Sequence, residues 1–184
     1  RERAARFHFP RDRRRFIAGR GLLRAVLARY LGTAASAVRI RGDAGRKPQL
    51  HGPDDGGLRF NVAHSEDLAL YAVAWQREVG IDVERIRPEL DWAALAARFF
   101  SPPERAALAG AGAEAAALFT RLWVAKEAYL KATGLGLAGR LDQAPAWRIA
   151  GLDVGPDYAA AVAAEGQGWR VVLADWGRES VSAG

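Results

Sequence analysis

The stretch EVGIDVERIRP, Glu78 to Pro88, places two carboxylates inside an apolar strand pattern. Asp82 and Glu84 are two residues apart, so on an extended chain both side chains point to the same face. Like charges held this close repel each other, and carboxylates are poor strand formers. A cation in front of the strand would remove the repulsion. The structural alternative is an exposed strand end whose carboxylates pair with Arg85 or Arg87.

Helical and strand patterns lie on both sides of this stretch. Before it, Asp12 is the expected N-cap of a helix that Gly32 ends, and the strands expected are Val38–Arg41, Leu58–Ser65 and Leu68–Trp75. After it we expect helices at Asp91–Phe100, from the SPPE stretch that Ser101 caps, and at Glu114–Lys131. Three closing strands are predicted at WRIAG (147–151), YAAAVAA (158–164) and WRVVLADW (169–176). This order predicts an α+β fold with two halves of similar plan.

Composition and charge exclude several classes of function and indicate the kind of partner. The chain has 184 residues and no cysteine, which excludes disulfides, cysteine-ligated zinc and thiol catalysis. It contains no uncharged apolar run of the roughly 18 residues that a membrane span needs, and its Arg-rich beginning lacks a signal-peptide core, so a cytoplasmic location is predicted. The net charge is +6, and basic residues crowd the first fifty positions, as in RDRRR at Arg11–Arg15. Such a field favours an anionic partner, which would be nucleic acid, a phosphorylated small molecule or an acidic protein.

A second stretch, LWVAKEAYLKATGLGL from Leu122 to Leu137, carries a third carboxylate. On a helix, Trp123, Glu127 and Lys131 are spaced by four and share one face, apart from an apolar stripe of Leu118, Leu122, Ala125 and Tyr129. Taken alone, Glu127 and Lys131 are an ordinary surface pair. Taken with Asp82 and Glu84, three carboxylates without His or Cys suit a hard cation, most simply Mg²⁺.

A third stretch, FNVAHSED from Phe60 to Asp67, places His64 where an apolar strand gives way to a polar turn. A histidine at a strand end can donate a hydrogen bond to a phosphate, and the turn's backbone N–H groups can also hold anions. A lone histidine is more often structural, so this stretch indicates a phosphate-binding role only in combination with the other two stretches.

Together these stretches resemble the Sfp-type 4′-phosphopantetheinyl transferases of the holo-[acyl-carrier-protein] synthase superfamily. GRKPQL (45–50), FNVAHS (60–65), GIDVER (80–85), FFSPPER (99–105) and the Leu122–Leu137 stretch occur in that family's order, from about Arg3 to Leu137. The resemblance implies two similar α/β halves that form a pseudo-dimer, with the active site in the cleft between them. Residues 1–77 would be the basic, coenzyme-A-binding half, and residues 78–184 would carry the metal and catalytic motifs.

The same resemblance implies the reaction and its catalytic group. A carrier-protein serine would attack the phosphopantetheine phosphorus of coenzyme A, and adenosine 3′,5′-bisphosphate would leave. Asp82, Glu84 and Glu127 would hold Mg²⁺, with Mn²⁺ as an alternative. Glu127 would also be the general base, and Lys131 would neutralise pyrophosphate charge, so the catalytic residues would be Glu127, Asp82 and Lys131.

Contacts to coenzyme A are carried over in the same way. They would come from Arg3, Arg46, Lys47, Pro48, Ala63, His64 and Lys131. Three positions depart from the family pattern: Ala63 stands where many relatives have Ser and could offer only its backbone N–H, Arg46 replaces a Gly, and Arg3 stands where a Lys can occur. These departures bear on the phosphate contacts and not on the reaction.

The implied protein partner is an acidic acyl or peptidyl carrier domain, which a basic surface would steer to a monomeric enzyme. Neither nucleic acid nor a membrane is expected as a partner. Two other functions stay open. A basic nucleic-acid-binding module would leave the carboxylate trio unexplained. A different Mg²⁺-dependent phosphoryl or nucleotidyl transferase would lack a P-loop, because GLGLAGR (134–140) has no Gly-Lys-Ser/Thr ending. A catalytically dead, carrier-binding relative is disfavoured by the intact carboxylates and Lys131.

Overall fold

A computed structural model describes residues 9–42, 47–51, 56–134 and 147–176. Its elements, in chain order, are α2 (Pro10–Leu31), β1 (Ile40–Arg41), β2 (Gln49–Leu50), β3 (Leu58–Ser65), β4 (Leu68–Trp75), β5 (Val79–Arg85), α3 (Ala93–Phe99), α4 (Pro102–Gly110), the 3₁₀ helix η1 (Gly112–Glu114), α5 (Ala115–Thr133), β6 (Trp147–Leu152) and β7 (Tyr158–Glu165). This mixture of helix and sheet confirms the predicted α+β class. The pseudo-dimer, its cleft and the division after residue 77 stay predictions.

Helix α2 begins two residues before the predicted cap. Pro10 occupies the first turn, where a missing N–H costs nothing, and Phe9 is the N-cap, so the assignment of Asp12 as cap is wrong. Asp12 instead adds a favourable negative charge to the first turn. Leu23 and Leu27 are buried, and Gly32 ends the helix as predicted, in a left-handed conformation with φ of 62°.

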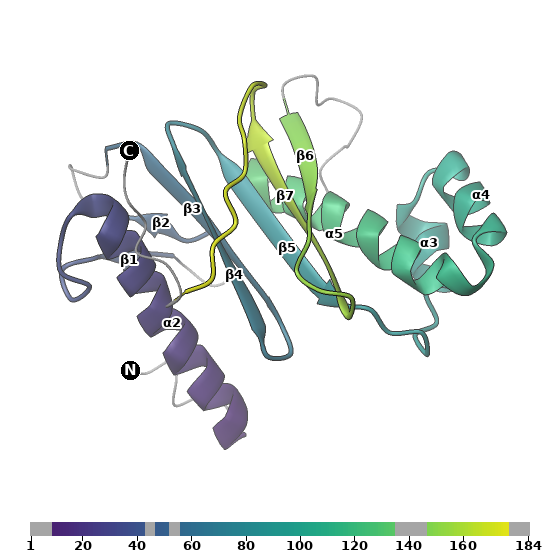
Figure 1. The fold of residues 1–184 in the computed structure, drawn as a ribbon, viewed down its shortest axis with the longest axis horizontal. Coiled ribbons are helices and arrows are strands. Elements are labelled where there is room, and N and C mark those ends of the chain that lie inside the picture. Colours follow the sequence, from purple (N-terminus) through teal and green to yellow (C-terminus); the bar gives the residue numbers. More distant parts are fainter. Residues whose placement is uncertain (1–8, 43–46, 52–55, 135–146, 177–184) are drawn as a thin grey trace.

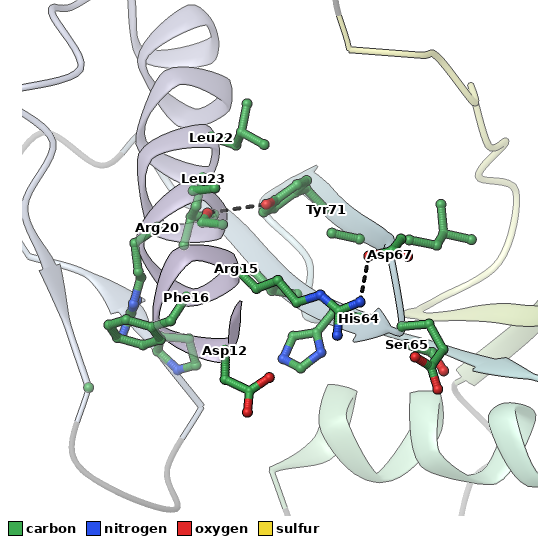
Figure 2. A pocket seen from close by; sticks show the side chains of 18 residues that line it. Asp12, Arg15, Phe16, Arg20, Leu22, Leu23, His64, Ser65, Asp67 and Tyr71 are labelled. Atoms are coloured by element: carbon green, nitrogen blue, oxygen red, sulfur yellow. Dashed lines mark hydrogen bonds and ion pairs between the residues drawn. The ribbon is translucent and has the colours of Figure 1, made fainter. Parts of the chain in front are cut away.

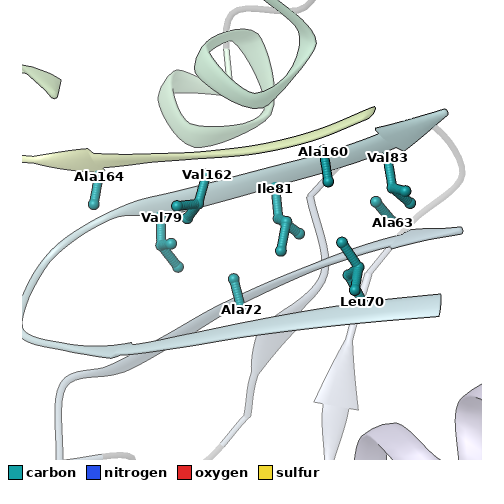
Figure 3. Close-up of a cluster of buried hydrophobic side chains, with 9 residues drawn as sticks. All are labelled: Ala63, Leu70, Ala72, Val79, Ile81, Val83, Ala160, Val162 and Ala164. Carbon is teal, nitrogen blue, oxygen red and sulfur yellow. The ribbon is translucent and has the colours of Figure 1, made fainter. Parts of the chain in front are cut away.

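The hairpin of β3 and β4 has the predicted ends and pairs from Leu58 opposite Trp75 to Ser65 opposite Leu68. Its two faces have different neighbours, because successive strand residues alternate sides. On one face, Phe60 and Val62 pack with the buried leucines of α2, which covers the hairpin in Figure 1. On the other, Ala63 packs against β5, together with Leu70 and Ala72 of β4 (Figure 3).

The second sheet has the order β5-β7-β6, with all neighbours antiparallel, and α5 packs on it. The alternation along β5 gives Val79, Ile81 and Val83 to the core shared with β3 and β4. It turns Gly80 towards α5, where a Cβ would lie 2.1 Å from the Ala128 carbonyl oxygen. Only glycine fits this contact, so Gly80 lets the backbone of α5 lie directly on β5.

Helices α3 and α4 lie at the far end of α5 (Figure 1). The predicted capping box is confirmed, since the Ser101 backbone N–H donates to Glu104 Oε2 at 2.7 Å. Phe100 and Phe119 stack in the small core beneath these helices, with ring centroids 5.2 Å apart. This core is separate from the one between the sheets.

Two further predictions about the elements are wrong. The segment WRVVLADW (169–176) is not a strand: both edges of β7 are already occupied by β5 and β6, and Val172 is 79% exposed. The apolar stripe of α5 is also different, because Val124 and Ala128 are buried with Tyr129, whereas Leu122 is only partly buried. In the part of the chain that the structure describes, no helix is long and apolar enough to cross a membrane.

Candidate active site

Asp82 lies at the centre of the site, on the side of β5 that carries Gly80. Its side chain is buried, with 4% exposed. Lys131 of α5 donates a hydrogen bond from Nζ to Asp82 Oδ1 at 2.6 Å. The other oxygen, Oδ2, is buried and has no hydrogen-bond partner among the residues described. Asp82 therefore offers a buried acceptor that none of the described residues satisfies.

Glu84 and Glu127 add negative charge near Asp82. Glu84, two residues along β5, accepts a hydrogen bond to Oε2 from Ser65 Oγ at 2.9 Å. Glu127 lies on α5 one turn before Lys131 and is half-buried. Burial raises the pKa of the Glu127 carboxyl, and the charges of Asp82 and Glu84 raise it further against the opposing effect of Lys131. The three carboxylates thus lie close enough to influence one another electrostatically, and their convergence on one metal ion stays a prediction.

The pKa of Asp82 is shifted by the same kinds of interaction. Burial raises the pKa of its carboxyl, the Lys131 ammonium opposes the shift, and Glu84 reinforces it. Within the described ranges, no three acidic or histidine side chains already lie in an arrangement that would hold a metal ion. The donor set is nevertheless one of carboxylate oxygens alone, the chemistry that Mg²⁺ prefers. Asp82 Oδ2, which has no hydrogen-bond partner in the described part of the chain, would be available as a ligand for such a cation.

A pocket of about 760 Å³ lies between α2 and the hairpin, on the side of β3 that faces away from β5. Pro48 and His64 line it, as do Arg15, Phe16 and Tyr71. Figure 2 shows Arg15 reaching from α2 to Asp67, with which it forms an ion pair. Ser65 also lines the pocket, so this residue touches both the pocket and the carboxylate Glu84.

The other predicted coenzyme-contacting residues are dispersed. Lys47 donates from Nζ to Glu78 Oε2 at 2.5 Å and to the Ala132 carbonyl oxygen at 3.3 Å, and its side chain is largely buried. Ala63 is buried in the core between the sheets, away from the pocket face that carries His64. Arg3 and Arg46 lie outside the described residues.

Sequence reasoning missed Ser65 and Arg15. Ser65 stands beside His64 at the end of β3, and a serine that ends an apolar strand next to a candidate ligand is a signal that was available. Arg15 belongs to the RDRRR run, in which nothing distinguishes one arginine from the next. Only the packing of α2 over the hairpin separates Arg15 from its exposed neighbours.

Comparison with known proteins gives matches over nearly the whole chain. Residues 78–177 match the model of the 4′-phosphopantetheinyl transferase superfamily, and residues 1–76 match that of the 4′-phosphopantetheinyl transferase N-terminal region. The 4′-phosphopantetheinyl transferase HetI of Nostoc sp. is 43% identical over 91% of this chain and 78% of its own. The transferase Sfp of Bacillus subtilis is 34% identical over 77% of this chain and 62% of its own.

A vertebrate protein is similar as well. The L-aminoadipate-semialdehyde dehydrogenase-phosphopantetheinyl transferase of Pongo abelii is 30% identical over 77% of this chain and 49% of its own. The chain thus spans about half to four fifths of the length of these three relatives. The matches give no support to the nucleic-acid-binding or nucleotidyl transferase alternatives.

Proposed function

This chain belongs to the 4′-phosphopantetheinyl transferase superfamily, and from that premise we propose that it transfers the 4′-phosphopantetheine arm of coenzyme A to a serine of an apo carrier protein. The observation that carries the proposal is the position of β3 between two features. The pocket with His64 lies on one side of this strand, and Asp82 and Glu84 on β5 lie on the other. Ser65 touches both features.

The pocket is the proposed site of coenzyme A. Its volume of about 760 Å³ is in the range of sites for small molecules and cofactors. His64 and Arg15 supply donors for phosphate groups, and Pro48 supplies an apolar wall. Roles for Lys47, for the Ala63 backbone, and for Arg3 and Arg46 stay predictions. The Lys47 ammonium would first have to leave Glu78 or act on the ligand from that position.

Asp82, Glu84 and Glu127 are the proposed ligands of Mg²⁺, with Mn²⁺ as an alternative. Oδ2 of Asp82 is buried and has no hydrogen-bond partner among the described residues, and the three carboxylates repel one another. Both observations fit a small divalent cation. A cation held there would neutralise the charge that develops on the pyrophosphate. Lys131, one third exposed and next to Asp82, would add a second positive charge at the same place.

The proposed chemistry is a single displacement at phosphorus. The serine Oγ forms a bond to the phosphorus of the phosphopantetheine arm, and the pyrophosphate P–O bond breaks. The electron pair of that bond leaves with adenosine 3′,5′-bisphosphate. The serine proton passes to the Glu127 carboxylate, whose raised pKa makes it a better base than an exposed glutamate at neutral pH.

The partner and the setting are proposals too. An acidic carrier domain would be drawn to a chain of net charge +6, and the exposed arginines of α2 lie on the pocket side of the hairpin. The enzyme is expected to act as a monomer in the cytoplasm.

A mass measurement tests the proposal directly. The protein is mixed with coenzyme A, Mg²⁺ and a panel of apo carrier proteins, and the carriers are weighed. A gain of one phosphopantetheine on at least one carrier supports the activity and identifies the substrate. A panel that gains no mass with the parent protein, while a known transferase modifies it, would overturn the activity.

A further inference from the structure

Two sheets meet in this protein where β3 lies against β5. Within the described residues, the hydrogen-bonded ladders pair β3 with β4 and β5 with β7, and no ladder joins β3 to β5. Both strands therefore end their sheets as edges. The backbone N–H groups on the open edge of β5 need other acceptors, because buried donors without a partner are costly.

Two side chains of β3 supply these acceptors. Asn61 Oδ1 accepts a hydrogen bond from the Ile81 backbone N–H at 2.9 Å, and Ser65 Oγ accepts one from the Arg85 N–H at 3.1 Å. Both side chains are buried, at 5% and 6% exposed. The spacing is four residues in each strand, so the two bonds fasten β5 at two points.

The two residues of β5 whose N–H groups are bound flank the carboxylates in the sequence. Ile81 directly precedes Asp82, and Arg85 directly follows Glu84. The Ser65 hydroxyl has a second role, because it donates to Glu84 Oε2 at 2.9 Å while it accepts from Arg85. A hydroxyl has one proton to donate, so these two bonds fix its orientation and direct its proton at the carboxylate.

We propose that Asn61 and Ser65 are positioning residues, which hold the Asp82–Glu84 segment in register with β3 and so fix the carboxylates relative to His64. This inference rests on the proposed function of the same site. His64 is the neighbour of Ser65 on β3 and points to the pocket face. One strand therefore sets the distance between the coenzyme pocket and the carboxylates. Loss of either acceptor should loosen the carboxylates more than it alters the pocket.

The first test follows the Mg²⁺ dependence of single-turnover transfer. Ser65→Ala removes the hydroxyl, and Ser65→Thr keeps it. For Ser65→Ala we expect the Mg²⁺ concentration at half-maximal rate to rise about 10- to 100-fold, as is typical when a partner of a metal ligand is lost. The apparent affinity for coenzyme A should fall by less than the Mg²⁺ affinity, although Ser65 also lines the pocket. Ser65→Thr should restore most of the Mg²⁺ affinity.

The matched control is Thr120→Val, which also removes one buried hydroxyl. Thr120 Oγ1 donates to the Ala116 carbonyl oxygen within α5, two turns before Glu127. This variant should leave the Mg²⁺ dependence of the parent unchanged. An equal shift in Thr120→Val and Ser65→Ala would overturn the inference, because the effect would then follow from any buried hydroxyl.

The second test needs no turnover. Hydrogen exchange of the β5 amides is measured in the full chain without coenzyme A. Asn61→Ala should raise the exchange rate at Ile81, whereas Asn61→Asp, which keeps an oxygen at this position, should raise it less. Ser65→Ala should raise exchange at Arg85. Unchanged exchange at both amides in folded variants would overturn the inference. Asn61→Asp and Ser65→Ala are small changes that keep the test open if Asn61→Ala does not fold.

The two tests also separate this inference from the activity itself. If the parent modifies no carrier but the variants show the expected exchange changes, the proposed transfer is disproved and the positioning role of Asn61 and Ser65 stands. If the parent is active but the variants have normal Mg²⁺ dependence and normal exchange, the positioning role is disproved and the proposed transfer stands.

Discussion

Lys131 Nζ lies 2.6 Å from Asp82 Oδ1, while the second oxygen of the same carboxylate is buried without a partner among the described residues. The lysine is one third exposed and the aspartate almost fully buried. The aspartate thus bears most of the cost of burial, and the lysine can turn to solvent. This asymmetry leads to different expectations for the two residues.

Replacing Asp82 should affect catalysis and spare the fold. Asp82→Asn keeps the shape but removes a proposed metal ligand. Transfer should fall by more than the roughly 10- to 100-fold that loss of an outer partner costs. The melting temperature should stay within about 4 °C, because Lys131 can reach water. Glu89→Gln, an exposed carboxylate on the loop after β5, is the control for both assays. Near-parental turnover of Asp82→Asn at saturating Mg²⁺ would rule out Asp82 as a ligand.

Replacing Lys131 should affect the fold more. Lys131→Met leaves the buried Asp82 carboxylate without the ion pair that it forms with Lys131. Breaking a fully buried pair costs about 3–5 kcal/mol, and partial exposure of Lys131 lowers the expected loss to about 1–2 kcal/mol. Mg²⁺ should raise the melting temperature of Lys131→Met more than that of the parent, because a cation replaces the lost charge. Calorimetric scans with and without Mg²⁺ measure this difference. An equal rise in both proteins would contradict the shared position of cation and ammonium.

Glu127 separates binding from chemistry. In Glu127→Gln the shape is kept, but proton acceptance and one negative charge are lost. General-base loss alone is typically about 10²- to 10⁴-fold in rate. The variant should still bind coenzyme A, since His64 and Arg15 remain in the pocket. In single-turnover measurements, raising the Mg²⁺ concentration should restore only the part of the rate loss that weaker metal binding causes. A rate within about threefold of the parent at saturating Mg²⁺ would remove the base assignment.

The pH dependence follows from the raised pKa values of Asp82 and Glu127, which burial causes first in both cases. Their folded-state pKa values lie above the unfolded ones. Without metal they therefore favour folding most at low pH, and this contribution is lost as the pH rises through the folded-state values. Mg²⁺ competes with protons for these two carboxylates. The stabilisation that Mg²⁺ gives to the folded protein should therefore increase as the pH rises through their folded-state pKa values. Melting temperatures from about pH 4 to 8, with and without Mg²⁺, test the sign. A Mg²⁺ increment that shrinks with rising pH would contradict it.

Gly80 should tolerate no side chain. A Cβ on Gly80 would lie 2.1 Å from the Ala128 carbonyl oxygen and 2.3 Å from the Ala132 nitrogen, both part of the α5 backbone. Gly80→Ala should cost about 3 kcal/mol, or roughly 6–12 °C in melting temperature. Gly21→Ala is the matched control, because a Cβ there has open space on a helix, and it should stabilise by about 0.5–1 kcal/mol. Similar effects of both changes would disprove the close contact of β5 with α5.

Local patterns in the sequence were sufficient for several elements. Strands β3 and β4 have the predicted ends, because alternating apolar residues and the polar Glu66–Asp67 turn fix them locally. The capping box at Ser101 and the glycine stop of α2 likewise depend on neighbouring residues alone. These features need no knowledge of the rest of the chain.

Tertiary context decided the features that were predicted wrongly or missed. The segment WRVVLADW has strand-forming residues, but no free edge of β7 remains for it. The face of α5 that lies on β5 carries the small residues Ala128 and Ala132, which let the helix approach Gly80, and not the predicted stripe of Leu122 and Ala125. Likewise, Asn61 and Ser65 become meaningful only when β5 lies beside β3 without a ladder.

If the proposed sites are correct, the two faces of β3 also separate coenzyme binding from the chemical step. Phe16 and Tyr71 line the pocket on the α2 side, where the Tyr71 hydroxyl donates to the Gly19 carbonyl oxygen of that helix. Selection, or a protein engineer, could therefore remodel the pocket wall for altered coenzymes while the reacting centre keeps its geometry. A strand shared in this way would allow the specificity for the coenzyme to change while the carboxylates keep their positions.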